Sequence, residues 1–338
     1  MQNLSGVVYM IFDYGFSIRG KYHIKREICC QDSHRICKME NGWYIAAVAD
    51  GVGSAENSQI GAQLAVNSVV DFCYRYMPCD YDVESIKSMI RTAFNYAYKQ
   101  ILKESQTRGE PIESYDTTLS MVIYDGQRII YGHSGDGAII GLTTFGDYVE
   151  ITRPQKGSDG ISVLPLRAGY AQWVIDTYEE DLVSVLLMTD GMRETLCPYL
   201  LRVYDPKTVK AYIPLISFFA DPAGISDNTD FQQLRRQIEE FLVADENYPS
   251  ENFYARLLDI YNSHMNESAI AVINDIKKNN FPIILMQNEQ DDKTIVGLIN
   301  TDVPLDDKPI EFYSEPNWAE LQEEWNRVAY PHLYRKEK

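Results

Sequence analysis

The stretch AVADGVGSAENSQIGAQLAV, residues 47–66, sets the main expectation for the fold of this chain. It opens with small apolar residues, stops at Asp50-Gly51 and continues as a short polar loop. Apolar residues then recur at helical spacing from Ala62, so the pattern predicts a buried strand, a turn and a helix. A buried strand that ends on a carboxylate places a charged group at the rim of a sheet, on a backbone fixed by its neighbours.

Other aspartates share this setting. Asp190 follows the apolar run 182–189 and precedes a glycine, and Asp136 lies between two glycines. Asp291 comes just before the strand-like stretch TIVGLI, and Asp32 follows Cys-Cys-Gln. A single Asp-Gly pair is more often a plain turn than a ligand, so the repetition is what indicates a site.

Five converging carboxylates need a cation, because like charges close together raise each other's pKa. Oxygen ligands without histidine or cysteine favour magnesium or manganese over zinc. Two such ions lower the pKa of a bridging water and hold a phosphoryl group for in-line attack. The carboxylates therefore predict phosphoester hydrolysis without a covalent enzyme intermediate.

The remaining pattern mixes helices and strands. Helical spacing covers residues 57–77, and a second helix begins after Asp82 as its N-cap. Short apolar runs with turns at residues 125–126 and 135–137 predict a meander over residues 119–152. Because the helices cluster rather than alternate with strands, we expect an α+β fold of antiparallel sheets flanked by helices.

Composition and charge restrict the partners. The 338 residues are 45% hydrophobic and 24% charged, which is typical of a globular chain with a sizeable core. The net charge of -18 argues against a nucleic-acid or anionic-membrane partner, since phosphates would be repelled. The six cysteines have no C-x-x-C spacing, and no apolar run is long enough for a signal peptide or a membrane span. We therefore expect reduced thiols and a cytoplasmic location.

The order of the motifs resembles that of the metal-dependent, type 2C serine/threonine protein phosphatases, and more closely their bacterial branch. The matching motifs are Gly20-x-x-His23 with Cys30-Gln31-Asp32, DGVGS at 50–54, TTL at 117–119, Gly135-Asp136, TDGM at 189–192 and DDKT at 291–294. The resemblance covers about residues 15–195 and 285–300. Each motif is weak alone, whereas their common order is specific.

The resemblance implies a fold and an activity. The fold would be an antiparallel β-sandwich with helices packed outside both sheets and the active site at one end. The activity would be hydrolysis of serine/threonine phosphomonoesters in proteins by a metal-bridging hydroxide, with two or three Mg2+ or Mn2+ ions as cofactors.

The resemblance also implies roles for individual residues. Asp50 would bridge the two core ions, and the Gly51 carbonyl would bind one of them. Asp190 and Asp291 would hold the other core ion, and Asp32 would bind directly or through water. In this scheme Asp50 and Asp190 are the main catalytic carboxylates.

The resemblance also implies that Asp136 would assist a weaker third ion. Two other outer positions depart from the family pattern. Many relatives carry a histidine at the position of Val52 and a phosphate-binding arginine at the position of Glu27. We therefore assign the general acid to His23 and phosphate binding to Arg26, although a lone histidine is more often structural.

We expect one phosphatase domain over residues 1–302 that includes a helical insertion at 198–281. The insertion is a packed accessory subdomain, a flap, a docking surface or an oligomer interface. The tail, residues 303–338, is predicted to pack on the domain through a helix bearing Trp318 and Trp325, because exposing both indoles would be costly.

The expected partners are a phosphorylated protein substrate and a cognate serine/threonine kinase. The alternative is a catalytically weak or inactive phosphatase-fold protein that binds a ligand or partner, which the missing histidine at Val52 favours. The complete set of carboxylates favours activity. The Cys29-x5-Arg35 spacing lacks the glycines of a phosphate loop, and the near match to a P-loop at 15–22 ends on tyrosine instead of a small hydroxyl residue.

Overall fold

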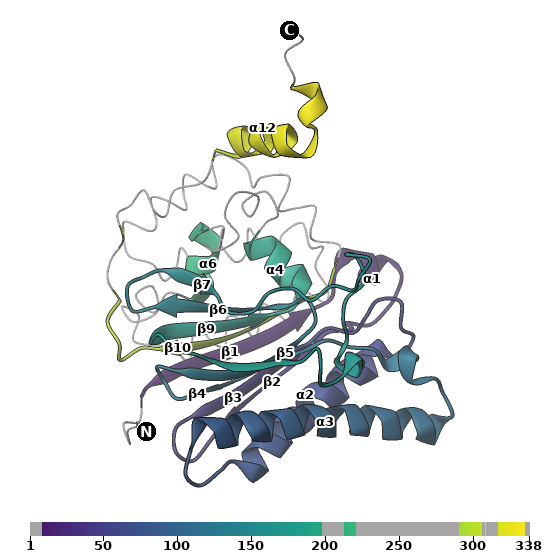
Figure 1. Ribbon diagram of the computed structural model, residues 1–338, viewed down its shortest axis with the longest axis vertical. Coiled ribbons are helices and arrows are strands. Elements are labelled where there is room, and N and C mark those ends of the chain that lie inside the picture. Colours follow the sequence, from purple (N-terminus) through teal and green to yellow (C-terminus); the bar gives the residue numbers. More distant parts are fainter. Residues whose placement is uncertain (1–8, 198–212, 221–290, 306–307, 309–316, 335–338) are drawn as a thin grey trace.

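Two five-stranded antiparallel sheets pack face to face in the computed structural model (Figure 1). The structure describes residues 9–197, 213–220, 291–305, 308 and 317–334. The first sheet has the order β1 (Ile11–Ile18), β10 (Lys293–Asn300), β9 (Leu182–Met188), β6 (Ala138–Thr143) and β7 (Tyr148–Glu150). The second has the order β2 (Ser33–Lys38), β3 (Tyr44–Ala49), β4 (Leu119–Tyr124), β5 (Ile129–Ser134) and β8 (Val174–Tyr178).

Helices cover the outer faces of both sheets. The helices in the described part of the chain are α1 (Lys21–Lys25), α2 (Ser58–Tyr76), α3 (Val83–Arg108), α4 (Asp190–Leu196), α6 (Ile213–Ala220) and α12 (Trp318–Ala329), with short 3-10 turns η1 (Ile112–Tyr115), η2 (Leu166–Ala168) and η6 (Pro331–Leu333). Helices α2 and α3 pack on the second sheet, and α4 and α6 lie against the first (Figure 1). The predicted α+β sandwich with helices on both sides is confirmed.

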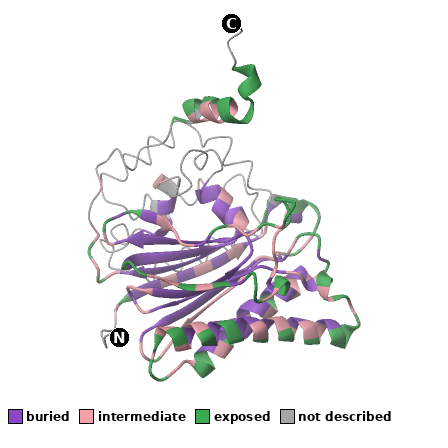
Figure 2. Ribbon diagram, viewed as in Figure 1, coloured by how far each residue is buried: buried purple, intermediate pink, exposed green. Residues whose placement is uncertain are grey.

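Strand β3 shows why the alanine-rich stretch lies at the centre of the fold. Ile45, Ala47 and Ala49 belong to the apolar cluster shared with α2 and α3. Ala46 and Val48 belong to the cluster between the two sheets. The strand is buried on both faces, as the interior of Figure 2 shows, and small side chains let both layers approach it closely.

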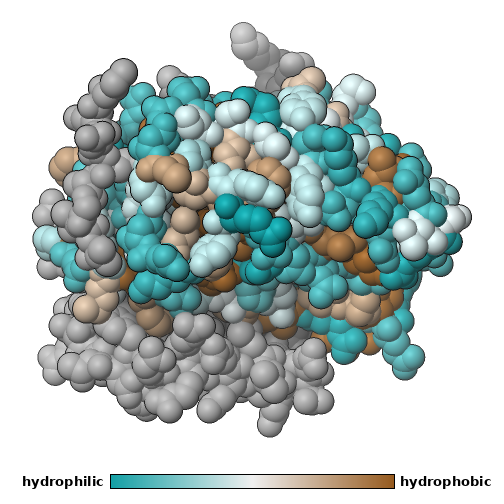
Figure 3. All heavy atoms as spheres, turned by 90° about the horizontal axis from the view of Figure 1, so that it is seen from below, coloured by the Kyte–Doolittle hydropathy of each residue, from teal (hydrophilic) through white to brown (hydrophobic). Residues whose placement is uncertain are grey.

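The predicted helices form where their end signals lie. The side chain of Asp82 accepts a hydrogen bond from the Ser85 N–H at 3.0 Å and caps α3. Gly109 ends the same helix with a φ of 71°, a left-handed conformation that glycine adopts without strain. Seen from below, the molecule is largely hydrophilic with scattered apolar patches (Figure 3), as expected for helices that bury one face.

The predicted meander over residues 119–152 is wrong at residues 135–137. Strand β5 pairs with β4 and β8 in the second sheet, whereas β6 pairs with β7 and β9 in the first. The glycine-rich turn therefore carries the chain from one sheet to the other instead of closing a hairpin. Gly135 has a φ of 120° and a Cβ on Gly137 would lie 2.6 Å from the Met188 carbonyl oxygen, so the crossing depends on glycine.

Other predictions have mixed outcomes. Strands β2 and β8 and helix α1 were not predicted, because their apolar residues show no clear period. The tail helix with Trp318 and Trp325 is present as α12, while its packing on the domain, like the division at residue 302, stays a prediction. Apart from α6, the insertion at 198–281 lies outside the described residues.

All six cysteines are free thiols, as expected. Among the helices that the structure describes, none combines the length and apolarity needed to cross a membrane. The cytoplasmic location stays a prediction.

A substitution at Gly61 tests the contact between α2 and η1. A Cβ at this position would lie 2.1 Å from the Tyr115 carbonyl oxygen, a backbone atom that cannot move cheaply. Gly61→Ala should therefore lower the free energy of unfolding by about 1–3 kcal/mol, although alanine favours helix by about 1 kcal/mol. Urea unfolding measures the change. The exposed Gln63→Ala on the same helix is the control, and a stabilised Gly61→Ala protein would contradict the contact.

Candidate functional site

Asp50 is fixed at the end of β3 by hydrogen bonds from two threonines. Its N–H donates to Thr118 Oγ1 at 2.9 Å, and its carbonyl accepts from the Thr118 N–H at 2.8 Å and from Thr117 Oγ1 at 2.9 Å. These contacts join the end of β3 to the start of β4. The backbone of Asp50 is therefore held before any ligand is considered.

Asp136 and Asp190 come from two other segments of the chain and lie close to Asp50. Asp136 lies on the crossing between β5 and β6, and Asp190 begins α4 directly after β9. One carboxylate oxygen of each of Asp50, Asp136 and Asp190 lies within 4.8 Å of the others. The structure thus brings together three of the aspartates that the sequence singled out.

Asp32 and Asp291 act on this cluster electrostatically. Burial first, and then Asp32, Asp190 and Asp291, raise the pKa of Asp50 well above its ordinary value. Burial, followed by Asp136 and Asp291, raises the pKa of Asp190 to about 7. All five aspartates therefore belong to one interacting group, in which negative charges are expensive without a cation.

Asp32 is held by a threonine at the start of α4. Thr189 occupies the N-cap position, where a hydroxyl usually caps its own helix. Its Oγ1 instead donates to Asp32 Oδ2 at 2.7 Å and accepts from the Thr294 N–H at 3.0 Å. This hydroxyl links the loop before β2 to β9 and β10. The other carboxylate oxygen, Asp32 Oδ1, takes no part in this hydrogen bond.

The donor set fits a hard divalent cation. Asp32 Oδ1 and Asp190 Oδ1 are buried and have no hydrogen-bond partner among the described residues. Burying a carboxylate oxygen without a partner is costly, and an ion bound by several carboxylates removes that cost. Oxygen-only ligands are those that Mg2+ and Mn2+ prefer. A magnesium or manganese centre is the arrangement that these residues suit.

Asp291 and its neighbour Asp292 have different surroundings. Asp292 is buried and accepts hydrogen bonds from the Gly20 N–H at 2.7 Å and the Gln31 N–H at 2.6 Å. Its Oδ1 also lies 2.8 Å from His23 Nδ1. Asp292 therefore organises the backbone around the site, while Asp291 is the member of the pair that interacts with Asp50 and Asp190.

The other predicted site residues are placed as follows. His23 is buried beside Asp292 and also interacts electrostatically with Asp291. Arg26 is exposed and stacks on Tyr22, with its Cζ 4.3 Å from the ring centroid. Glu27 has a φ of 58°, an uncommon conformation for a residue with a side chain. The roles assigned to His23 and Arg26 stay predictions.

Gly51 has a packing reason to be glycine. A Cβ there would lie 2.7 Å from atoms of Ser58 and 2.8 Å from the Gln31 carbonyl oxygen. Its N–H donates to the same Gln31 carbonyl at 3.1 Å. The residue lets the loops at Asp32 and Asp50 approach each other, and the metal-binding role of its carbonyl stays a prediction.

Sequence reasoning missed Lys156, whose Nζ forms an ion pair with Asp136 Oδ2. The residue is far from Asp136 along the chain and lies in no motif, so no signal pointed to it. The threonines at 117, 118, 189 and 294 stood inside the motifs, and only the structure shows that their hydroxyls and amides fix Asp32 and Asp50.

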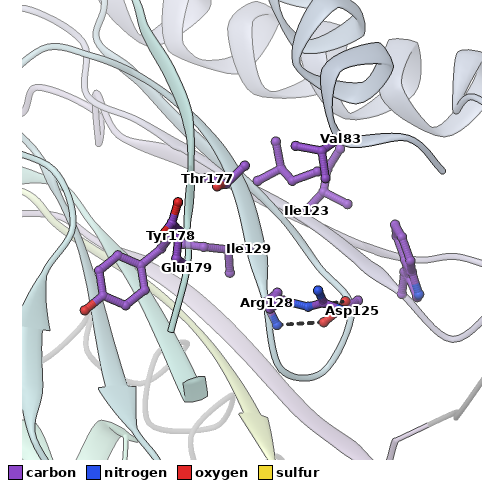
Figure 4. Close-up of a pocket in the computed structure, with 10 residues that line it drawn as sticks. Val83, Ile123, Asp125, Arg128, Ile129, Thr177, Tyr178 and Glu179 are labelled. Atoms are coloured by element: carbon purple, nitrogen blue, oxygen red, sulfur yellow. Dashed lines mark hydrogen bonds and ion pairs between the residues drawn. The ribbon is translucent and has the colours of Figure 1, made fainter. Parts of the chain in front are cut away.

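A cavity of about 290 Å³ lies away from the carboxylates. It is lined by Trp43, Asp125, Arg128, Tyr178 and others from the opposite ends of β3, β4 and β5, and Figure 4 shows the Asp125–Arg128 ion pair at its edge. The six residues of β3 separate Trp43 from Asp50, a span of about 20 Å. The cavity is therefore not part of the carboxylate site.

Comparisons with known proteins point to one family. The model of the family described as protein phosphatase 2C matches residues 19–243. A crystal structure of a bacterial serine phosphatase is similar with a TM-score of 0.51 at 10% identity, covering 88% of this chain and 100% of that chain. The serine/threonine phosphatase Stp1 from Staphylococcus aureus has a TM-score of 0.51 at 10% identity, and the match covers 88% of this chain and 98% of that chain. The S. agalactiae serine/threonine phosphatase has a TM-score of 0.50 at 12% identity, and the match covers 86% of this chain and 99% of that chain.

Identities this low show a shared fold, whereas the family match shows descent. A search of curated protein sequences gave no significant match.

The raised pKa of Asp190 predicts an unusual pH dependence for the metal-free protein. A carboxyl with a folded pKa of about 7 holds a proton that the unfolded chain releases, so folding stability falls as pH rises toward and through 7. In EDTA, the melting temperature should therefore rise on the order of 5 °C between pH 8 and pH 6. Burial also raises the pKa values of Asp50 and Asp32, which adds to the same pH dependence.

Asp190→Asn should flatten this dependence and raise the melting temperature at pH 8. Asp71→Asn, an exposed carboxylate on α2 paired with Arg35, should leave it unchanged. A wild-type protein that is more stable at pH 8 than at pH 6 would contradict the electrostatic account of the cluster.

Proposed function

The chain belongs to the protein phosphatase 2C family of metal-dependent serine/threonine phosphatases, and we propose how its own residues carry out that hydrolysis. Asp50, Asp190 and Asp291 hold the core divalent ions, which are Mg2+ or Mn2+, and Asp32 supports them directly or through water. One observation supports this most: aspartates from separate segments converge at one end of the sandwich, and two of their buried oxygens have no hydrogen-bond partner in the described part of the chain.

Bound divalent ions would supply an activated water and would offset the charge of the phosphoryl group. The chain supplies the geometry. Thr117 and Thr118 fix Asp50 at the end of β3, and Thr189 fixes Asp32. These hydrogen bonds come from rigid elements, so the carboxylates are organised before substrate arrives.

His23 is our candidate for the group that protonates the leaving serine or threonine oxygen. Asp292 Oδ1 lies 2.8 Å from its Nδ1, so the imidazole sits directly beside a buried carboxylate. Asp292 is itself held by the Gly20 and Gln31 N–H groups, so the pair is rigid. Arg26 is exposed on the same short helix region and is the candidate that binds the phosphate of the substrate.

The substrate is a phosphorylated protein, as the family implies. A cognate serine/threonine kinase that produces it is the partner we expect. A catalytically inactive binding protein of the same fold is the alternative, and it is separated from the enzyme by turnover alone.

Removal of a core carboxylate tests the site. With Mn2+, the wild type should hydrolyse p-nitrophenyl phosphate and a phosphothreonine peptide, and EDTA should abolish both reactions. Asp50→Asn and Asp190→Asn should lower kcat/KM by at least roughly 10²-fold, because even outer-shell partners of a metal typically matter 10–100-fold. Asp71→Asn is the matched surface control. Full activity in either site variant would contradict the assigned site, and no activity in the wild type would argue for the alternative.

The role of His23 predicts a dependence on the leaving group. A phosphothreonine peptide needs a proton on its alkoxide, whereas p-nitrophenolate leaves without one. His23→Asn should lower kcat for the peptide on the order of 10²-fold and for the aryl ester far less. An equal loss on both substrates would show that His23 only positions neighbouring groups.

A further inference from the structure

A lysine from a separate loop reaches the carboxylate cluster. Lys156 lies between β7 and η2, and its Nζ forms an ion pair with Asp136 Oδ2. The Asp136 side chain is 7% exposed and that of Lys156 is 40% exposed, so the pair lies at the border between the cluster and solvent. Asp136 shares its cluster with Asp50 and Asp190. Lys156 thus brings a positive charge to a group of three carboxylates.

Hydrogen bonds tie the loop to the turn that carries Asp136. The Gln155 N–H donates to the Gly135 carbonyl at 2.7 Å, and Gln155 Oε1 accepts from the Gly135 N–H at 3.0 Å. Gln155 Nε2 also donates to the Gln172 carbonyl at 2.7 Å. The residues directly before Lys156 and Asp136 are therefore bonded to each other at two points. The ion pair is built by the backbone and is more than a chance meeting of two flexible side chains.

The loop beyond Lys156 is also ordered by its own contacts. Lys156 forms an antiparallel bridge with Val163, and the Gly157 N–H donates to the Ser162 carbonyl at 2.7 Å. Lys156 is thus the first residue of a small closed loop whose base faces Asp136. Because the backbone is already ordered, only the rotamer freedom of the lysine side chain is lost when the ion pair forms.

An ammonium and a divalent ion compete at Asp136. Both are drawn to the same carboxylate, and their positive charges repel each other strongly in partly buried surroundings. A divalent ion that binds at Asp136 must displace Lys156 or remain weakly held. Among the described residues, Asp136 is the member of the cluster that forms an ion pair with a lysine, whereas Lys156 acts on Asp190 only through space.

We propose that the Lys156 ammonium neutralises Asp136 and so weakens the binding of any divalent ion there. This inference rests on the function proposed above. Lys156 is a positioning residue that sets how many ions are held tightly. On this account the tight ions are those of Asp50, Asp190 and Asp291, and the ammonium takes the place predicted for a third ion.

Calorimetric titration of the metal-free full-length protein with Mn2+ tests this without any turnover. In Lys156→Met, which keeps the length of the side chain and removes its charge, the weakest Mn2+ site should bind about tenfold tighter than in the wild type, a typical coupling between two sites. Lys156→Arg keeps the charge and should resemble the wild type. Asp136→Asn in the Lys156→Met background should abolish the gain, which closes a double-mutant cycle.

The outcomes separate the inference from the function on which it rests. Equal Mn2+ affinities in the wild type and Lys156→Met would overturn the inference, whereas a wild type that binds no Mn2+ would overturn the proposed metal centre. Lys156→Gln gives a second route that does not depend on the folding of Lys156→Met. It also removes the charge and should tighten the weakest Mn2+ site by about the same factor, and an unchanged affinity in both uncharged variants would overturn the role of Lys156. Melting curves in EDTA confirm that each variant is folded.

Discussion

Repulsion between buried carboxylates is the constraint on which the rest of this structure depends. Burial first, and then the charges of neighbouring aspartates, raise the pKa values of Asp32, Asp50, Asp190 and Asp291 at one end of the sandwich. A chain that only needed stability would not gather them. The surrounding sheets, each buried on the face toward the other, supply the rigidity that keeps these groups together at a cost in folding free energy.

The crossing at residues 135–137 gives the site its form. Because β5 belongs to the second sheet and β6 to the first, the turn between them spans the edge of the sandwich and carries Asp136 to Asp50 and Asp190. A simple hairpin would have left Asp136 within one sheet. A hydroxyl group also joins the two sheets. Thr189, which follows β9 of the first sheet, donates a hydrogen bond to Asp32, which precedes β2 of the second sheet.

The departures from the family pattern find physical counterparts in neighbouring residues. Val52 occurs where many relatives have a histidine, and the chain holds His23 against Asp292 close to Asp291. Lys156 adds a fixed positive charge at Asp136. The site therefore combines the aspartates of the family motifs with Lys156, a cation that lies in none of those motifs.

The local elements and the identity of the carboxylates could be predicted from the amino-acid sequence. The alanine-rich run before Asp50, the helical spacing after Ser58 and the cap at Asp82 all depend on contacts between near neighbours, which a linear pattern records. The order of motifs also predicted the sandwich. Tertiary structure alone decided the sheet to which β6 belongs, the pairing of His23 with Asp292 and the arrival of Lys156 at Asp136. These contacts join residues far apart in the chain, and their formation depends on packing and charge that no local period encodes.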